Sequence, residues 1–208
     1  MSLTMEERNI TPSEAYPGDK TTTKAAEPEL LKVEITGDRY TSKEFKDQEW
    51  KHMWRRVWMI AGMADDCADP GDFFTCDLGH EPLLFVRGKD GINGFYNICQ
   101  HRGAKLVLQE KGSMDSFSCI YHGWKYGMEG ELVDAQDRDD FERDPCEHVR
   151  LADFRTEIFA GFVWYCLDDD APGLDEFLGD IKEQLETWQL NDGFRVEHFT
   201  VELPCNWK

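Results

Sequence analysis

YNICQHRGAKL at residues 96–106 and CIYHGWKYG at residues 119–127 are the most informative stretches of this chain. Each of them pairs one cysteine with one histidine at short range: Cys99 with His101, and Cys119 with His122. Seventeen residues separate the first histidine from the second cysteine. Thiolates and imidazoles are side chains that bind transition metals. Two short loops of this composition can therefore hold a small metal centre between them.

The pairing of ligand types indicates which centre this is. A simple zinc finger pairs cysteine with cysteine and histidine with histidine, whereas each loop here is mixed. Mixed loops suit a two-iron cluster in which the thiolates share one iron and the imidazoles share the other, which is Rieske ligation. A structural zinc site with the same four ligands remains an alternative. A disulfide between Cys99 and Cys119 is another, although a reducing compartment disfavours it.

The residues around the four ligands make the pattern more specific. With YNICQHRGAKL and CIYHGWKYG the chain resembles the Rieske [2Fe–2S] domain in the large (α) subunit of aromatic-ring-hydroxylating oxygenases. The resemblance implies one [2Fe–2S] cluster, with Cys99 and Cys119 on the iron that stays ferric and His101 and His122 on the iron that is reduced. The expected fold is mainly β, an antiparallel Rieske-type domain whose two loops form a cluster-binding lobe.

The same residues place the cluster among Rieske types. The high-potential Rieske proteins of respiratory complexes are similar but add a cysteine to each loop and a serine after the His-Gly of the second. This chain lacks these cysteines, and Trp124 stands where the serine would be. Without that hydroxyl, a bridging sulfur has one hydrogen bond fewer and the reduced cluster is less stabilised. We expect a potential of roughly −150 mV and not one near +300 mV. Gly103, Gly112 and Gly123 are expected where the loops turn closely.

The resemblance runs from about Tyr40 to the last residues, LPCNWK, which are similar to the stretch by which these oxygenases enter their catalytic domain. In the family, that domain supplies two histidines and a carboxylate for a mononuclear iron that activates O2. No histidine pair with a nearby acid in this sequence could replace them. We therefore expect the electron-transfer portion of an oxygenase, truncated before the catalytic domain, with no catalytic residues of its own. Ring dihydroxylation, mono-oxygenation and oxidative demethylation all stay open.

The resemblance also implies partners. A ferredoxin or a flavin reductase would supply electrons, and the catalytic domain of a neighbouring subunit in a trimer would accept them. The alternative is a self-contained Rieske-type ferredoxin, a carrier with no substrate, which would need neither a 40-residue arm nor elements after residue 170. No G-x-G-x-x-G fingerprint indicates a flavin or nicotinamide site in the chain itself.

Composition excludes other classes of function. The 208 residues include 23 Lys and Arg against 42 Asp and Glu, a formal net charge of −19. Such an acidic chain is unsuited to nucleic acid and to anionic lipid. It has no apolar run long enough for a membrane span and no secretory signal, so we expect a cytoplasmic protein. Residues 99–127 carry a local charge of +2 from four bases and two acids. A positive cluster tip would favour acidic partner surfaces.

Hydrophobic periodicity gives the organisation of the chain. Residues 1–40 form a polar arm, and a helix is predicted over 41–57 with a capping box of Thr41 and Glu44. Residues 58–170 form the Rieske domain, with strands predicted at WMIAGM, DFFTCDL, EPLLFVRG, GFYNI and EIFAGFVWYCL. Residues 171–208 comprise a helix at 175–190 and a strand at 194–204 that leads into the catalytic domain. An unpaired edge of this kind predicts partial self-association.

The remaining cysteines and histidines lack the paired spacing of the two loops. We expect buried or idle thiols at Cys67, Cys76, Cys146, Cys166 and Cys205. We expect surface or supporting roles for His52, His80, His148 and His198.

Overall fold

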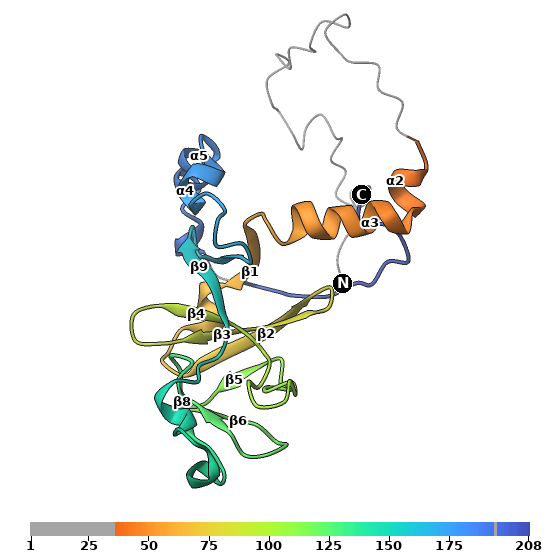
Figure 1. Ribbon diagram of the computed structural model, residues 1–208. Coiled ribbons are helices and arrows are strands. Elements are labelled where there is room, and N and C mark those ends of the chain that lie inside the picture. Colours follow the sequence, from red (N-terminus) through yellow and green to blue (C-terminus); the bar gives the residue numbers. More distant parts are fainter. Residues whose placement is uncertain (1–35, 194) are drawn as a thin grey trace, which may run out of the picture. The chain divides into compact units, whose positions relative to one another are not determined.

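The computed structural model describes residues 36–193 and 195–208 of the protein (Figure 1). The chain divides into two compact units, residues 1–39 and residues 40–208. Nearly all of the first unit, and with it the polar arm predicted for residues 1–40, lies outside the described residues. Every strand named here belongs to the second unit.

Two antiparallel sheets make up most of this unit (Figure 1), as predicted. The larger sheet has seven strands in the order β1-β10-β9-β4-β3-β2-β5. They are β1 (Met59–Met63), β2 (Asp72–Leu78), β3 (Glu81–Arg87), β4 (Ile92–Tyr96), β5 (Lys111–Ser113), β9 (Asp153–Phe159) and β10 (Phe162–Cys166). The smaller sheet has the order β6-β7-β8, with β6 (Phe117–Ser118), β7 (Lys125–Tyr126) and β8 (Leu132–Asp134).

The third strand, β3, explains why the larger sheet forms where it does. Its run Leu83–Val86 is completely buried, as expected of a central strand with both faces covered. In the pairing with β2, Phe85 lies opposite Phe74, and the two rings stack with their centroids 4.8 Å apart. Burial of large aromatic side chains in cross-strand pairs fixes the register of the sheet.

The prediction of one strand at EIFAGFVWYCL is wrong, because this stretch contains a tight hairpin. Strands β9 and β10 are joined at Ala160 and Gly161, which have φ angles of 52° and 78°. Two consecutive residues with positive φ are typical of a type I′ turn, the connection whose twist matches that of the flanking strands. Strand β10 then pairs with β1 and β9 pairs with β4, so residues after 152 complete the sheet.

The predicted N-terminal helix is present with a different beginning and a different end. After the short α2 (Asp38–Thr41), helix α3 (Lys43–Glu49) begins with Ser42 as its N-cap. The Ser42 hydroxyl accepts a hydrogen bond from the Phe45 N–H at 3.1 Å. The predicted cap at Thr41 is therefore one residue too early. The helix continues as a π-helix, η2 (Trp50–Trp54).

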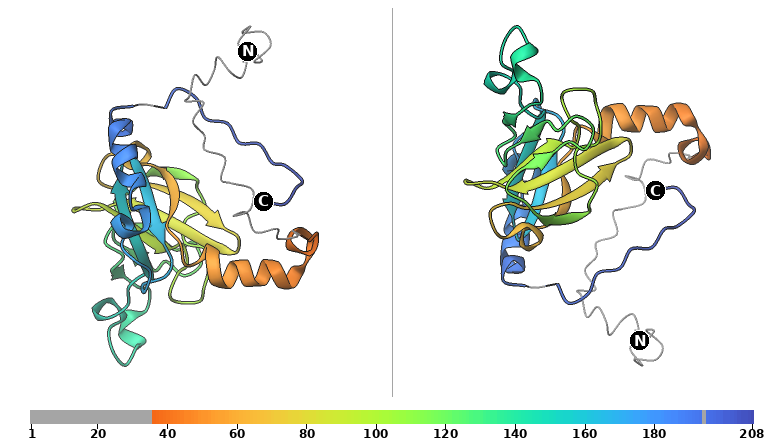
Figure 2. Two further views of the ribbon diagram at one scale, coloured as in Figure 1. Left: turned by 90° about the horizontal axis from the view of Figure 1, so that it is seen from above. Right: turned by 90° about the horizontal axis from the view of Figure 1, so that it is seen from below.

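The helix predicted at 175–190 is two short helices, α4 (Leu174–Leu178) and α5 (Ile181–Thr187). Gly179 separates them with a φ of 50°, in a conformation that interrupts the helix. The buried side chains of α4 form a small core with Trp164 and Cys166 of β10. The mid-blue α4–α5 segment accordingly lies against the cyan strands in the views of Figure 2. The remaining short helices are η3 (Ala64–Cys67), η4 (Arg138–Asp140), η5 (Pro145–Glu147) and η6 (Leu190–Asp192).

The strand predicted at 194–204 is not formed by residues 195–204, and residue 194 lies outside the described ranges. Alternating apolar side chains such as Val196 and Phe199 stay exposed because no strand pairs with this segment within the described residues. The tail is held at both of its ends: Arg195 forms an ion pair with Asp66, and Trp207 lies at the other end. Trp207 packs edge-on against Trp54, with 4.9 Å between the ring centroids. Among the described residues, no helix combines the length and the apolar character that a membrane span needs.

Candidate metal centre

The first cysteine–histidine loop continues from β4 and is closed by its own backbone. The Cys99 N–H donates to the Ala104 carbonyl at 2.8 Å, and the Gly103 N–H donates back to the Cys99 carbonyl at 2.9 Å. A bridge between Ile98 and Lys105 holds the base of the loop. These contacts fix the backbone on both sides of His101.

The second loop joins β6 to β7 and repeats the same pattern. The Cys119 N–H donates to the Trp124 carbonyl at 2.8 Å, and the Gly123 N–H donates to the Cys119 carbonyl at 2.9 Å. Both Gly103 and Gly123 have positive φ, 74° and 69°, so their glycine requirement is conformational. The prediction that the loops turn at these glycines is confirmed. Gly112, in contrast, lies in β5, with the Phe73 ring 3.0 Å from where its Cβ would be.

The two loops bring all four predicted ligand side chains together. Cys99 and Cys119 are buried and belong to the same core cluster. The rings of His101 and His122 lie edge to face with their centroids 4.7 Å apart. The thiols belong to the buried core and the imidazoles are only half-buried, so the imidazole end of the group is the end nearer to solvent.

The chemistry of this donor set fits a two-iron cluster. The Nδ1 atom of His101 is buried and has no hydrogen-bond partner among the described residues, so its lone pair is available to a metal. Burial, with smaller contributions from His122 and Arg102, lowers the pKa of His101 and favours the neutral imidazole that metals bind. Within the described part of the chain, no three His, Cys, Asp or Glu side chains converge on one point, as a single-ion site requires. A cluster needs only two protein donors for each iron.

An aromatic wall covers one face of the first histidine. The buried indole of Trp124 stacks on His101, with the centroids 4.7 Å apart and the planes inclined by 13°. Phe141 meets the indole edge-on at 6.0 Å. The position after His122-Gly123 therefore holds a ring that orients an imidazole, and it offers no hydroxyl.

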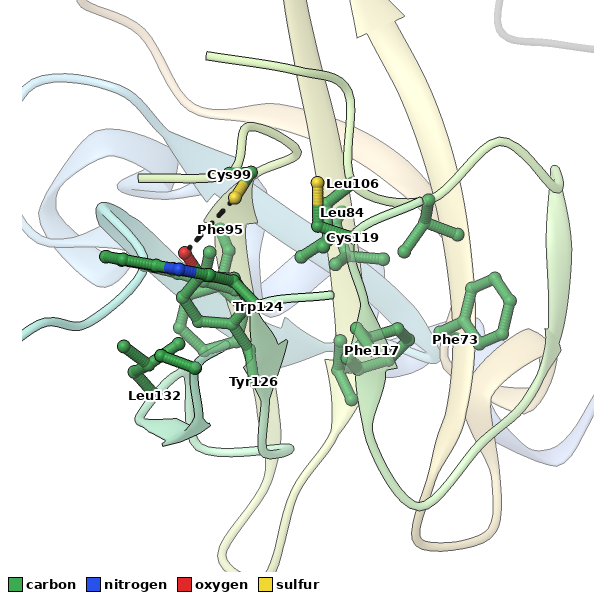
Figure 3. Close-up of a cluster of buried hydrophobic side chains, with 14 residues drawn as sticks. Phe73, Leu84, Phe95, Cys99, Leu106, Phe117, Cys119, Trp124, Tyr126 and Leu132 are labelled. Atoms are coloured by element: carbon green, nitrogen blue, oxygen red, sulfur yellow. Dashed lines mark hydrogen bonds between the residues drawn. The ribbon is translucent and has the colours of Figure 1, made fainter. Parts of the chain in front are cut away.

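Sequence reasoning missed Tyr126, whose side chain is fully buried beside the first cysteine (Figure 3). Its hydroxyl lies 3.4 Å from the Cys99 sulfur and accepts a hydrogen bond from the Gln100 N–H at 3.0 Å. Because the Gln100 N–H occupies an acceptor site, the hydroxyl proton is free to point at the sulfur. Burial raises the pKa of Tyr126, so this proton stays on the oxygen at neutral pH. An aromatic residue next to the second loop is a weak signal, since most such residues are simply core.

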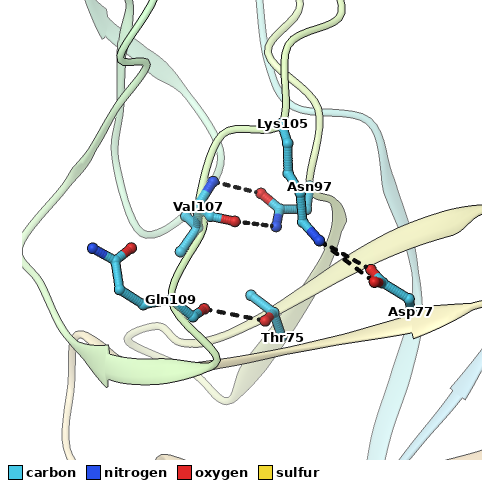
Figure 4. A network of polar contacts seen from close by, with 6 residues as sticks. All are labelled: Thr75, Asp77, Asn97, Lys105, Val107 and Gln109. Atoms are coloured by element: carbon cyan, nitrogen blue, oxygen red, sulfur yellow. Dashed lines mark hydrogen bonds and ion pairs between the residues drawn. The ribbon is translucent and has the colours of Figure 1, made fainter.

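Asn97 was also missed, and it positions the first loop (Figure 4). This fully buried side chain accepts from the Val107 N–H at 2.8 Å and donates to the Val107 carbonyl at 2.7 Å. It thereby joins the two ends of the loop behind the cluster ligands. The available signal was an amide at an inward position, since Phe95 and Cys99 on either side of it are also buried.

The other cysteines are free thiols away from this group, as expected. Burial raises the pKa of both Cys67 and Cys76 to about 11, so both are protonated and unreactive at neutral pH. Cys166 is buried as well, and Cys146 is half-buried against the core below the loops. Cys205 is exposed in the C-terminal tail.

Comparison with known proteins agrees with this geometry. Residues 57–152 match the family model of the Rieske [2Fe–2S] domain. The chain is 33% identical over 183 residues to the biphenyl 2,3-dioxygenase subunit alpha of Rhodococcus jostii, covering 81% of this chain and 38% of that protein. It is 28% identical over 170 residues to the glycine betaine monooxygenase oxygenase subunit of Pseudomonas aeruginosa, covering 81% of this chain and 39% of that protein.

Solved structures give the same result. The quaternary ammonium Rieske monooxygenase CntA in complex with gamma-butyrobetaine superimposes with a TM-score of 0.78 at 28% identity, covering 83% of this chain and 51% of that one. A variant of naphthalene 1,2-dioxygenase bound to phenanthrene superimposes with a TM-score of 0.66 at 35% identity. The match covers 70% of this chain and 34% of that one. The chain thus spans about two fifths of the length of the relatives named above. Residues 57–152 therefore belong to the Rieske [2Fe–2S] domain family, and over 81% of its length the chain is similar to oxygenase α subunits such as that of biphenyl 2,3-dioxygenase.

Proposed function

We propose that Cys99 and Cys119 bind one iron of the [2Fe–2S] cluster and that His101 and His122 bind the other. One observation carries this assignment: two loops with the same backbone hydrogen bonds bring two buried thiols and two half-buried imidazoles together. A [2Fe–2S] cluster at this position supplies one-electron redox chemistry. The imidazoles, which lie nearer to solvent, are the natural exit for the electron.

The surrounding residues tune this site. Trp124 holds the plane of His101 and keeps water from one of its faces. Tyr126 directs its hydroxyl proton at the Cys99 sulfur and so stabilises negative charge there. Asn97 prevents the first loop from opening by bonding both backbone groups of Val107. Together these contacts keep the donor atoms in place in both charge states.

We further propose that the domain receives electrons from a ferredoxin or a flavin reductase and passes them to a mononuclear iron that activates O2 in an oxygenase. The similarity to oxygenase α subunits over 81% of the chain, beyond residues 57–152, supports this role over that of a self-contained ferredoxin. A structurally similar quaternary ammonium Rieske monooxygenase transfers electrons between its subunits. By analogy, the acceptor iron for this chain would lie in a neighbouring subunit.

The test is the metal content and spectrum of the purified chain. We expect about two irons and two acid-labile sulfides per chain. Electron–nuclear double resonance spectroscopy of the reduced cluster should detect two coordinated nitrogens. Cys99→Ser should abolish or strongly shift the spectrum. Cys76→Ser is the matched control and should leave it unchanged, because Cys76 lies in β2, away from the loops. Stoichiometric zinc in protein reconstituted with iron and sulfide would contradict the assignment.

A further inference from the structure

A cavity of about 290 Å³ opens beside the two histidines. Besides His101 and His122, the residues that line it include Trp124, Phe141, Asp137 and Asp140. Asp137, Asp140 and Phe141 belong to the segment between β8 and β9. This segment is drawn in teal and projects from the sheets in both views of Figure 2. This segment therefore adds one wall to a pocket whose opposite wall is the proposed cluster site.

The acidic residues of the pocket lie outside any ion pair of the described residues. Neither Asp137 nor Asp140 has an ion-pair partner among the described residues, and the adjacent Arg138 is paired with Asp144. The prediction of a positive cluster tip was made from residues 99–127 alone. It missed these two carboxylates, which are distant in the sequence and come next to the histidines only in the fold.

The aromatic walls suit the same kind of ligand as the carboxylates. Trp124 and Phe141 meet edge to face at 6.0 Å, and both line the cavity. Carboxylates attract a cation directly, and aromatic faces attract it through their quadrupoles. A guanidinium or ammonium group on a flexible side chain matches this combination of charge and shape.

Exposed apolar side chains near the histidines indicate a protein as the source of that cation. Ile120 and Tyr121 are 77% and 58% exposed, and Phe141 is 42% exposed. The Tyr121 ring packs on His122 with the centroids 3.9 Å apart. Exposed large apolar residues grouped around a functional site are typical of a protein-binding surface.

We propose that this pocket receives an arginine or lysine side chain of the protein that exchanges electrons with the cluster. Insertion of that side chain between Asp137, Asp140 and the aromatic wall sets the edges of His101 and His122 against the partner. The inference rests on the proposed function, since it needs the electron to pass through these imidazoles. It adds the charge of the partner surface, which is basic at its centre.

Small redox reagents of opposite charge test the pocket without the partner protein. Protein reduced with dithionite and freed of excess reagent is mixed with hexaammineruthenium(III), a cation, or with ferricyanide, an anion. Each reagent takes one electron from the reduced cluster, and stopped-flow absorbance gives the rate. In the Asp137→Asn/Asp140→Asn variant we expect about a tenfold slower reaction with the cation at low salt and a faster one with the anion. Asparagine tolerates the positive φ of 55° at Asp137.

The matched control is Asp169→Asn/Asp170→Asn, which removes the same charge from the turn before α4, outside the pocket. It should change both rates less than twofold. Millimolar acetyl-Gly-Arg-Gly-amide should slow the reaction with hexaammineruthenium(III) in the parent protein and not in the pocket variant. If the pocket variant behaves like the control, the inference is overturned. Asp140→Asn alone serves if the double variant fails to fold. Absence of the cluster spectrum from the parent protein would contradict the proposed function itself, a separate outcome.

Discussion

The hydroxyl of Tyr126 should raise the midpoint potential of the cluster. Tyr126→Phe removes the hydroxyl that lies 3.4 Å from the Cys99 sulfur and leaves the packing of the ring intact. The reduced cluster is the more negative state and gains more from that hydrogen bond, so the midpoint potential should fall. A loss of ~1 kcal/mol corresponds to roughly 40 mV for one electron. Protein-film voltammetry measures this shift.

The control for Tyr126 is another buried tyrosine. Tyr165→Phe removes a hydroxyl whose contact is the Met59 sulfur at 4.0 Å, in the core of the large sheet. We expect the potential of this variant to stay within about 10 mV of the parent value, because no charge-assisted bond to the cluster is lost. Equal potentials in both variants and the parent protein would show that the Tyr126 proton does not reach the sulfur.

Asn97 should matter for retention of the cluster. Asn97→Ala leaves the buried N–H and carbonyl of Val107 without partners, at a cost of about 2–4 kcal/mol. We expect the visible absorbance to decay faster on incubation with a chelator. Thr75→Val removes one exposed bond, to the Gln109 carbonyl at 3.1 Å, and should leave the decay rate near that of the parent protein. Unchanged retention in Asn97→Ala would mean that the loop holds without this bond.

These residues also show what the sequence could and could not supply. The ligand candidates were found because paired cysteine and histidine residues at short spacing are rare and have few uses. Tyr126 and Asn97 could not be found in this way, since a tyrosine in a strand and an asparagine before a loop are common in many folds. Their roles depend on distances across the fold, to Cys99 and to Val107, and local sequence does not encode those distances.

The carboxylate of Glu129 holds together two turns beside the small sheet. Its carboxylate accepts the Lys89 N–H at 2.9 Å and an Asn93 side-chain N–H at 2.9 Å, which links the turn after β7 to the turn after β3. The Lys89 backbone bond is the main cause that holds the pKa of Glu129 below its usual value. A depressed carboxyl pKa contributes stability above the unfolded pKa of ~4.3, and this stability is lost as the pH falls through the folded pKa.

Glu129→Gln should accordingly lower the free energy of unfolding by about 1 kcal/mol at pH 7. The difference from the parent protein should shrink below pH ~4, where the parent carboxylate is also protonated. Urea titrations at several pH values measure both quantities. Glu142→Gln is the control, because it makes the same chemical change at an exposed residue. It should leave the free energy of unfolding nearly unchanged. A difference that stays constant down to acidic pH would show that the charge of Glu129 contributes nothing.

Secondary structure was predictable where one local rule dominated. The strands DFFTCDL and EPLLFVRG are found at β2 and β3 because apolar runs between turn residues leave few alternatives. The hairpin at Ala160-Gly161 was missed because alanine gives no warning of a positive φ. The segment 195–204 alternates like a strand, yet a strand also needs a neighbour to hydrogen-bond with, and that is a property of the whole structure.

At the scale of the whole molecule, the unpaired tail predicts association. Val196 is 88% exposed, and Phe199, Val201 and Leu203 are exposed beside it. An exposed apolar segment with free backbone groups tends to pair with another chain. We expect partial self-association of the 208-residue protein, and a more monomeric protein with the same cluster spectrum after deletion of residues 192–208. Sedimentation equilibrium measures the change. Equal association of both proteins would place the contact elsewhere.

The potential is the second property of the molecule as a whole. The position after His122-Gly123 holds the stacked indole of Trp124, which gives no hydroxyl to a bridging sulfur. We therefore expect a midpoint of roughly −150 mV. A midpoint well above ~0 mV would contradict this account. Trp124→Ser should raise the potential if the new hydroxyl reaches a sulfur, and the change should be visible by the same voltammetry.

The repeated hydrogen bonds of the two loops have a consequence for the biogenesis of the protein. One loop extends a strand of the large sheet and the other lies within the small one, so a cluster held by both is a cross-link between the sheets. Like a disulfide, it closes the intervening chain and penalises the unfolded ensemble. The two sheets also share a buried core that needs no metal, so we expect chains without the cluster to keep this packing and lose only the cross-link. Proteases should then cut such chains faster than chains that carry the cluster, because local opening is easier.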